Sequence, residues 1–190
     1  KNDFIEGLNL SDSGTLTEEY QPNNLMRILA GGLYHFEIPW LKRWTISSSM
    51  EFGWISNQDV DSFFHFYLGG LPGIKGYPFY SIQGSKSILL NSIFRIPLFR
   101  EKHIKSMWMI WQNSTIGIGL QAGDAWTKEF KLKKSIGFEW RLNGFSFYNF
   151  PTAIELEYHH PMDRFIRKID DKLIEYGKEG RTYVKVLFDF

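Results

Sequence analysis

The sequence predicts an all-β protein, namely an antiparallel up-and-down transmembrane β-barrel to which this chain contributes about eight strands. Three observations support this prediction. Apolar and polar residues alternate with a period of two along most of the chain. Many alternating stretches have about ten residues, the length of a tilted strand that crosses a bilayer. The connections alternate between short and long, as expected for tight periplasmic turns and larger external loops.

The eight predicted strands are at 3–10, 25–38, 44–55, 86–98, 105–122, 131–142, 151–160 and 180–190. In the second, Met26, Ile28, Tyr34, Phe36 and Ile38 oppose Arg27, His35 and Glu37, and the third and fourth follow the same pattern. In the fifth, Ile116, Ile118, Leu120 and Ala122 alternate with Thr115, Gly117, Gly119 and Gln121. We therefore expect each strand to have one apolar and one polar face.

The last three strands alternate most regularly. In the sixth, Leu132, Ile136, Phe138, Trp140 and Leu142 oppose Lys133, Ser135, Gly137, Glu139, Arg141 and Asn143, and only Lys134 interrupts the apolar face. In the seventh, Thr152, Ile154, Leu156 and Tyr158 oppose Glu155, Glu157 and His159. In the eighth, Val184, Val186, Phe188 and Phe190 oppose Arg181, Lys185 and Asp189. In hydrocarbon every backbone N–H and C=O group must be hydrogen-bonded, so the sheet must close into a barrel. The polar faces of its strands are then expected to line a wet interior.

The connections suggest which end of the barrel is which. Three are short (39–43, 99–104 and 143–150) and four are longer (11–24, 56–85, 123–130 and 161–179). Aromatic residues near them suit two girdles, with Trp40, Trp44, Tyr148 and Phe150 at the short turns and Trp126 at the other end. Within the last long connection, Phe165, Ile169, Leu173 and Tyr176 have helical spacing and predict a short surface helix at 162–176.

Composition excludes several other classes of protein. The chain has 22 basic and 21 acidic residues, which gives no basic surface for nucleic acid. It has no cysteine, which excludes disulfides and thiolate metal sites, and no apolar run long enough for a transmembrane helix. It opens Lys1-Asn2-Asp3, with neither an initiator Met nor a signal peptide, and we interpret it as an excised or processed fragment.

The chemistry of enzymes is not evident in this sequence. Hydrolase, phosphate-binding and metalloprotease motifs are absent, so we expect no enzymatic activity and no cofactor. The five histidines lack metal-ligand spacing, and we expect no metal site. Glu139, Glu155 and Glu157 share a polar face, and we interpret them as a solvated lumen wall rather than an acid/base pair. Their expected partners are Arg95, Arg141 or Lys133.

The stretch 66–77 (FYLGGLPGIKGY) resembles the hallmark loop of the bacterial surface-antigen superfamily, the sixteen-stranded barrels of outer-membrane assembly and two-partner secretion. In that family a Gly-Gly pair precedes a hydrophobic-Arg-Gly-aromatic tetrad, on a long loop that folds into the lumen. The matching residues are Gly69, Gly70, Ile74, Lys75, Gly76 and Tyr77, within a lumen-directed loop at about 56–85. The continuation Gly76-Tyr77-Pro78-Phe79 is similar to barrels that follow a Tol-like β-propeller.

Three later segments resemble the same family, in the family's order. They are 91–98 (NSIFRIPL) through Arg95, Pro97 and Leu98, 119–126 (GLQAGDAW), and the C-terminal sorting signal with Phe188 and Phe190. The resemblance spans about residues 25–190. It implies that the eight strands are the second half of a sixteen-stranded barrel in the bacterial outer membrane.

The chain departs from the family at positions that matter for mechanism. In the family, the loop arginine reaches an acidic residue of the barrel wall. Here that arginine is Lys75 and the expected Asp is Gln121, so a bidentate fork is lost. The resemblance implies Gln121, Glu139 and Arg95 as wall residues near the loop, with Glu139 as a possible acceptor for Lys75. The usual glycine of the terminal signal is Lys185.

The resemblance implies a role in inserting proteins into the outer membrane or transporting them across it. Its expected partners are outer-membrane lipid, client outer-membrane or secreted proteins, and the barrel-assembly machinery for its own insertion. Two alternatives stay open. One is a barrel that anchors an N-terminal propeller or enzyme domain. The other is a soluble barrel that binds an apolar ligand, which requires the Ile/Leu/Phe faces to point inward.

Overall fold

The computed structural model describes residues 2–10, 14, 16–23, 25–41, 43–58, 60–147, 150–169 and 172–188. These residues form an all-β structure with one 3-10 helix, η1 (Ser62–Phe64), and no α-helix. The main sheet is antiparallel in the order β14-β11-β10-β9-β7-β4-β3, and β8 pairs with β9. Its strands are β3 (Arg27–Glu37), β4 (Thr45–Ile55), β7 (Lys86–Phe99), β8 (Ile104–Ser106), β9 (Met109–Trp126), β10 (Lys133–Ser146), β11 (Phe150–Pro161) and β14 (Arg181–Phe188).

Seven of the eight predicted strands are confirmed in this sheet, although a turn at 107–108 divides the fifth, predicted at 105–122, between β8 and β9. Its register follows the dyad pattern, because Phe138 of β10 lies opposite Ile118 of β9 and Tyr158 of β11. One residue further on, Glu139 lies opposite Gly117 and Glu157. Paired residues share a face, so one face of the sheet collects the apolar side chains and the other the polar ones. We call them the apolar face and the polar face.

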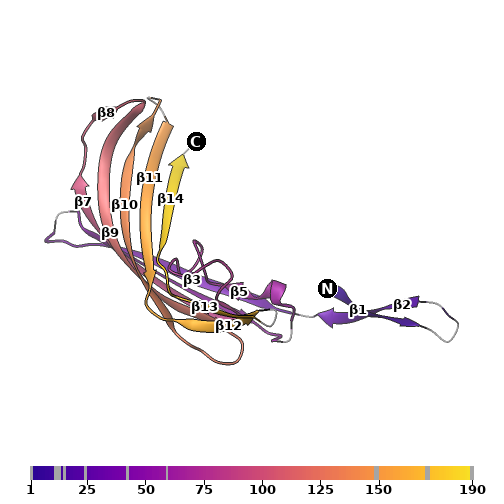
Figure 1. Ribbon diagram of the computed structural model, residues 1–190. Helices are drawn as coiled ribbons and strands as arrows, with labels where there is room; N and C mark the ends of the chain where they lie inside the picture. The colour runs from indigo at the N-terminus through magenta and orange to yellow at the C-terminus, as the bar shows by residue number, and fades with distance from the viewer. Residues whose placement is uncertain are drawn as a thin grey trace.

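The first predicted strand does not belong to this sheet. β1 (Asn2–Leu10) pairs with β2 (Leu16–Asn23) in a separate two-stranded sheet that projects from the rest of the chain (Figure 1). The prediction failed because 16–23 (LTEEYQPN) lacks alternation and contains proline, so it resembled a loop. In the described residues no strand pairs with the outer edges of β3 and β14, and the sheet is not a closed barrel.

The predicted helix at 162–176 is wrong. The segment forms a hairpin of β12 (Phe165–Ile169) and β13 (Lys172–Tyr176), with Phe165 opposite Tyr176. Ring contacts of Phe165 with Tyr77 (5.6 Å between centroids) and Tyr176 (5.4 Å) hold this arrangement. Tertiary packing therefore overrides the helical spacing. The supposedly long connection 123–130 is also shorter than expected, because β9 and β10 leave only 127–132 between them.

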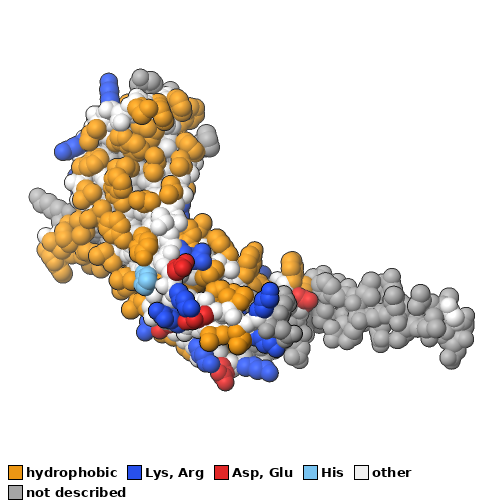
Figure 2. Space-filling model, viewed as in Figure 1, with side chains coloured by type: hydrophobic (Ala, Val, Ile, Leu, Met, Phe, Trp, Pro, Cys, Tyr) orange, Lys and Arg blue, Asp and Glu red, His pale blue; other side chains and the backbone are white. Residues whose placement is uncertain are grey.

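The strands of the main sheet curve strongly, and β14 ends at the same end of the sheet as β8 and the short turns (Figure 1). Orange side chains cover much of the surface seen in Figure 2. Exposed aromatic residues gather at the short turns, as predicted for Trp40 and Phe150, which are 80% and 47% exposed. The predicted Tyr148 lies outside the described residues. Trp108 stacks on Phe147 at the same end, a pair that the sequence did not indicate.

Candidate functional site

The long connection between β4 and β7 folds into a compact loop. β5 (Phe66–Tyr67) pairs with β6 (Gln83–Gly84), and residues 68–82 between them form what we call the folded loop. Inside it, the backbone N–H of Ile74 donates to the carbonyl of Leu68 (2.5 Å). The N–H of Gly70 donates to the carbonyl of Tyr77 (2.9 Å). The folded loop is therefore held by its own backbone hydrogen bonds.

Two glycine positions of the predicted motif have clear steric reasons. A Cβ on Gly69 would lie 1.8 Å from the carbonyl oxygen of Pro78, so only glycine allows the loop to close. Gly70 has a φ of 82°, a left-handed conformation that favours glycine. On the side facing the sheet, a Cβ on Gly76 would lie 2.7 Å from the Cβ of Ser135. The motif glycines therefore permit both the tight fold and the close approach to β10.

An apolar cluster joins the folded loop to the sheet. Its buried members are Ile55, Val60, Phe66, Leu68, Ile74, Tyr77, Ile82, Leu89 and Ala125. Ile74 and Tyr77 are both 0% exposed. The core of this chain therefore lies between the loop and the sheet.

The Tyr77 hydroxyl crosses from the loop to two other segments. It donates to the carbonyl of Asp163 (2.8 Å) or of Lys134 (3.1 Å) and accepts from the N–H of Asp163 (3.2 Å). Burial raises the pKa of Tyr77 to about 12, so it remains a donor at ordinary pH. Tyr77 thus ties the folded loop to the start of β10 and to the segment before β12.

Lys75 is anchored at three points. Its ammonium lies 2.8 Å and 2.7 Å from the two carboxylate oxygens of Glu157 on β11. Its backbone N–H donates to the side-chain oxygen of Gln121 (2.9 Å), and its carbonyl accepts from the Tyr183 hydroxyl (2.8 Å). The Lys75 and Glu157 side chains are 12% and 1% exposed, so this ion pair is buried.

The expected wall residues are placed as follows. Gln121 contacts the loop as predicted, since its amide also donates to the carbonyl of Gly73 (3.2 Å). Glu139 does not pair with Lys75, because Arg95 holds it in a bidentate fork (2.8 and 3.1 Å). Glu157 lies opposite Glu139 one strand further along, where the loop lysine reaches it. Of the three cations predicted to pair with these carboxylates, Arg95 does so, whereas Lys133 pairs with Asp124 and Arg141 donates to the Asn143 side chain.

The three wall carboxylates form a buried network with cations. Glu139, Glu155 and Glu157 offer oxygen atoms within 4.8 Å of one another, a spacing that suits a metal ion. Lys185 lies 2.5 Å from Glu157 and 3.7 Å from Glu155. With Arg95 and Lys75, three cations therefore face three carboxylates, and these pairs occupy the oxygens that a metal would need. The expectation of a solvated wall is wrong, since the carboxylates are 4%, 5% and 1% exposed.

Sequence reasoning missed several residues that hold the loop. The sequence places Lys185 on the polar face and at the usual glycine of the terminal signal, but it does not indicate Glu157 as its partner, nor the contact of Tyr183 with the loop. Arg167 donates to the carbonyls of Tyr80 (2.9 Å) and Ser81 (3.2 Å) and to the Gln83 side chain. This contact was not predicted, because the segment 162–176 was expected to form a surface helix rather than a hairpin that packs on the loop. Of the predicted sorting signal, Phe188 is 51% exposed, and Phe190 lies outside the described residues.

No family model, curated protein or solved structure matches this chain. Among the residues that the structure describes, no helix is long and apolar enough to cross a membrane.

Proposed function

We propose that this chain is the C-terminal half of a bacterial outer-membrane β-barrel of the surface-antigen superfamily, in which the folded loop lies in the lumen and is the functional element. The observation that carries the proposal is the inverted distribution of polarity. Ile118, Phe138 and Tyr158 are 52%, 47% and 47% exposed, whereas Glu139 and Glu157 are 4% and 1% exposed. A soluble sheet buries its apolar face, and a barrel in lipid exposes it.

The exposed apolar band is long and continuous across strands. Register places Ile116, Trp140, Leu156 and Val184 in one row, and Phe94, Ile118, Phe138 and Tyr158 in the next. Burial of apolar surface is worth roughly 25 cal/mol per Å². Hydrocarbon around the apolar face would recover this free energy, and water would not. The same orientation argues against a soluble barrel with an apolar interior, since Glu139, Glu155 and Glu157 lie on the face that meets the loop.

The outer edges of β3 and β14, which no other described strand pairs with, support a wider barrel. Backbone N–H and C=O groups in hydrocarbon must be paired, so both edges require further strands. The folded loop also needs more room than a small barrel provides, because eight-stranded barrels are filled by side chains. We infer a barrel wall in which this sheet is one half. Its activity would be the insertion of proteins into the outer membrane or their translocation across it, without enzymatic chemistry.

Fractionation of the full-length protein, expressed with its export signal, tests the proposal. We expect it in the outer-membrane fraction, with a detergent-stable form that migrates differently on gels before and after heating. Depletion should reduce the assembly or secretion of other outer-membrane proteins. A protein that remains soluble and monomeric without detergent would contradict the proposal.

A membrane anchor is the second candidate. Gly76-Tyr77-Pro78-Phe79 is similar to the propeller-linked barrels, and Lys75 replaces the arginine of the transport barrels. The many bonds that hold the folded loop also suit a permanently closed lumen. In this case depletion would displace an attached domain from the cell surface and leave other outer-membrane proteins unchanged. Propeller blades upstream of Lys1 would favour the anchor, and repeated chaperone-like periplasmic domains would favour assembly.

A further inference from the structure

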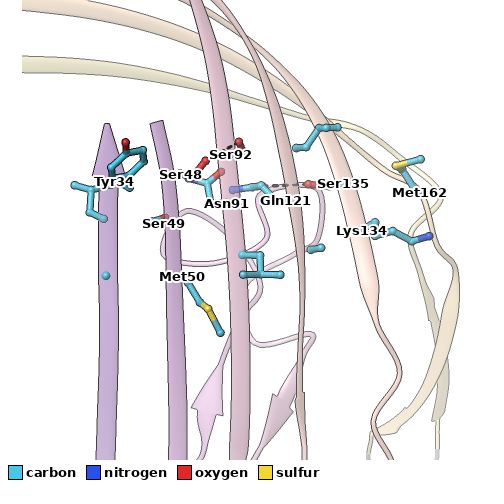
Figure 3. A pocket seen from close by; sticks show the side chains of 15 residues that line it. Tyr34, Ser48, Ser49, Met50, Asn91, Ser92, Gln121, Lys134, Ser135 and Met162 are labelled. Carbon is cyan, nitrogen blue, oxygen red and sulfur yellow. Dashed lines mark hydrogen bonds between the residues drawn. The ribbon is translucent and has the colours of Figure 1, made fainter. Parts of the chain in front are cut away.

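A groove of about 830 Å³ crosses the apolar face at mid-sheet. Its lining residues belong to β3, β4, β7, β9 and β10 and include Met162. Figure 3 shows Tyr34 at one side of it and Lys134 and Met162 at the other. Two adjacent rows of the register line it. One row is Tyr34, Ser48, Ser92 and Leu120, and the other is Gly32, Met50, Leu90, Ala122 and Lys134.

The groove is hollow because small residues interrupt a face that is otherwise large and apolar. A Cβ on Gly32 would meet no atom within 4 Å, so the space beside it is open. Ser48 and Ser92 bond to each other through their hydroxyl oxygens (2.9 Å) and present little polarity to the groove. Met50 and Leu90 beside them are 48% and 42% exposed. The surface of the groove is therefore mainly apolar.

Lys134 lies at the rim of this groove and is the one charged residue among the described residues that line it. It is the residue that interrupts the apolar face of β10 in the sequence. Its backbone is fixed, because its N–H donates to the Asp163 carboxylate (2.8 Å) and its carbonyl accepts from the N–H of Met162 (2.9 Å). Among the described residues its ammonium has no ion-pair partner. It lies one residue from the start of β10, at the end of the sheet with the long loops.

We propose that the groove binds the acyl chain of an anionic membrane lipid whose phosphate pairs with Lys134. This inference rests on the proposed function, since it requires the apolar face to contact lipid. A cation on a lipid-facing strand is costly at the midplane and tolerated near the interface, where lipid phosphates lie. The apolar groove matches the acyl chain of such a lipid, and Lys134 at its rim matches the phosphate.

The groove suits a lipid better than an added strand of another chain. A strand binds through backbone hydrogen bonds, which a sheet offers at its edges. Among the described strands, the edges without a partner are the outer edges of β3 and β14, whereas the groove lies on the face of the sheet, across β3, β4, β7, β9 and β10. Of these five strands only β3 has an unpaired edge in the described residues. An occupant of the groove therefore contacts side chains alone.

Lipid retention by the full-length protein in nanodiscs tests the inference. Discs that contain phosphatidylglycerol and phosphatidylcholine in equal amounts are used, and retained lipids are counted by native mass spectrometry after release. Wild-type protein should retain phosphatidylglycerol preferentially. Lys134→Gln should lower that preference about fivefold, the factor expected for one lysine near anionic lipid. The matched control Lys105→Gln changes an exposed lysine of β8 at the opposite end and should leave it unchanged.

A second variant tests the apolar groove separately from the charge of Lys134. Gly32→Leu places a side chain in the groove, at a position where a Cβ meets no atom within 4 Å, so it should reduce retention of both lipids while the heat-modifiable form persists. Equal phosphatidylglycerol preference in wild type and Lys134→Gln would overturn the inference, as would unchanged retention in Gly32→Leu. If the wild-type protein does not enter the membrane at all, the proposed function fails and the lipid site fails with it. Membrane insertion without lipid preference overturns the lipid site alone.

Discussion

Mutation of Glu157 should destabilise the closed state of the folded loop more than mutation of its ion-pair partner Lys75. Removal of one partner from a buried pair typically costs about 3–5 kcal/mol. In Glu157→Gln, Lys75 loses its carboxylate and Lys185 keeps only that of Glu155, at 3.7 Å. We therefore expect loop opening to become easier by about 3–5 kcal/mol. In Lys75→Met, Glu157 keeps Lys185 at 2.5 Å and His159 at 3.3 Å. The expected loss is then about 1–3 kcal/mol, that of a partly satisfied group.

Loop opening can be measured by cysteine labelling, because the chain has no native cysteine. Ser81→Cys places a thiol in the folded loop at a position that is 2% exposed. When closing is fast, the labelling rate follows the open population, and tenfold corresponds to about 1.4 kcal/mol. Lys131→Met is the control, since the Lys131–Glu129 pair is 75% and 76% exposed and should contribute little. Equal rates for Lys75→Met and Glu157→Gln, or the reverse order, would refute the reasoning.

Three further perturbations follow from the loop geometry. Tyr77→Phe should ease opening by about 1–3 kcal/mol in the same labelling assay, because the N–H and carbonyl of Asp163 lose the hydroxyl and the carbonyl of Lys134 keeps only Met162; an unchanged rate would contradict this. Gly69→Ala should prevent the loop from closing against Pro78, whereas Gly32→Ala should be tolerated, as judged by protease resistance of the loop. Burial lowers the pKa of His65, so its neutral form favours the folded state and stability should fall as pH drops below about 6.5. His65→Gln should remove that part of the pH dependence of the gel-shift midpoint; an identical pH profile would count against it.

The sheet was largely predictable because its information is local. Alternation fixes which residues share a face, and a one-residue slip would move Glu139 to the apolar side, so register is strongly determined. The strand at 16–23 was not predictable, because it lacks alternation and its pairing with β1 is confined to one hairpin. The hairpin at 165–176 was missed because helical spacing and a packed hairpin both suit Phe165 and Tyr176.

The candidate site was predictable in its residues and less so in its partners. The glycine-rich motif located the folded loop, and alternation placed Glu139, Glu157 and Lys185 on one face. Lys75 pairs with the carboxylate that the loop brings it to, which depends on how far the loop extends across the sheet. The local alternation of residues does not predict that distance. The same holds for Tyr183, whose contact with Lys75 joins residues 108 positions apart. Lys134, an interruption of the pattern, had no interpretation until the groove beside it was known.

The central claim is that the apolar face contacts hydrocarbon and the polar face does not. Single cysteines along 136–141 test it most directly, in the full-length protein inserted in membranes. Positions Ile136, Phe138 and Trp140 should resist a water-soluble maleimide and react with a membrane-permeant one that partitions into lipid. Positions on the polar face should not react with the membrane-permeant reagent in this way. The labelling along 136–141 should therefore alternate with a period of two residues. Rapid aqueous labelling of the apolar positions in intact membranes would contradict the account.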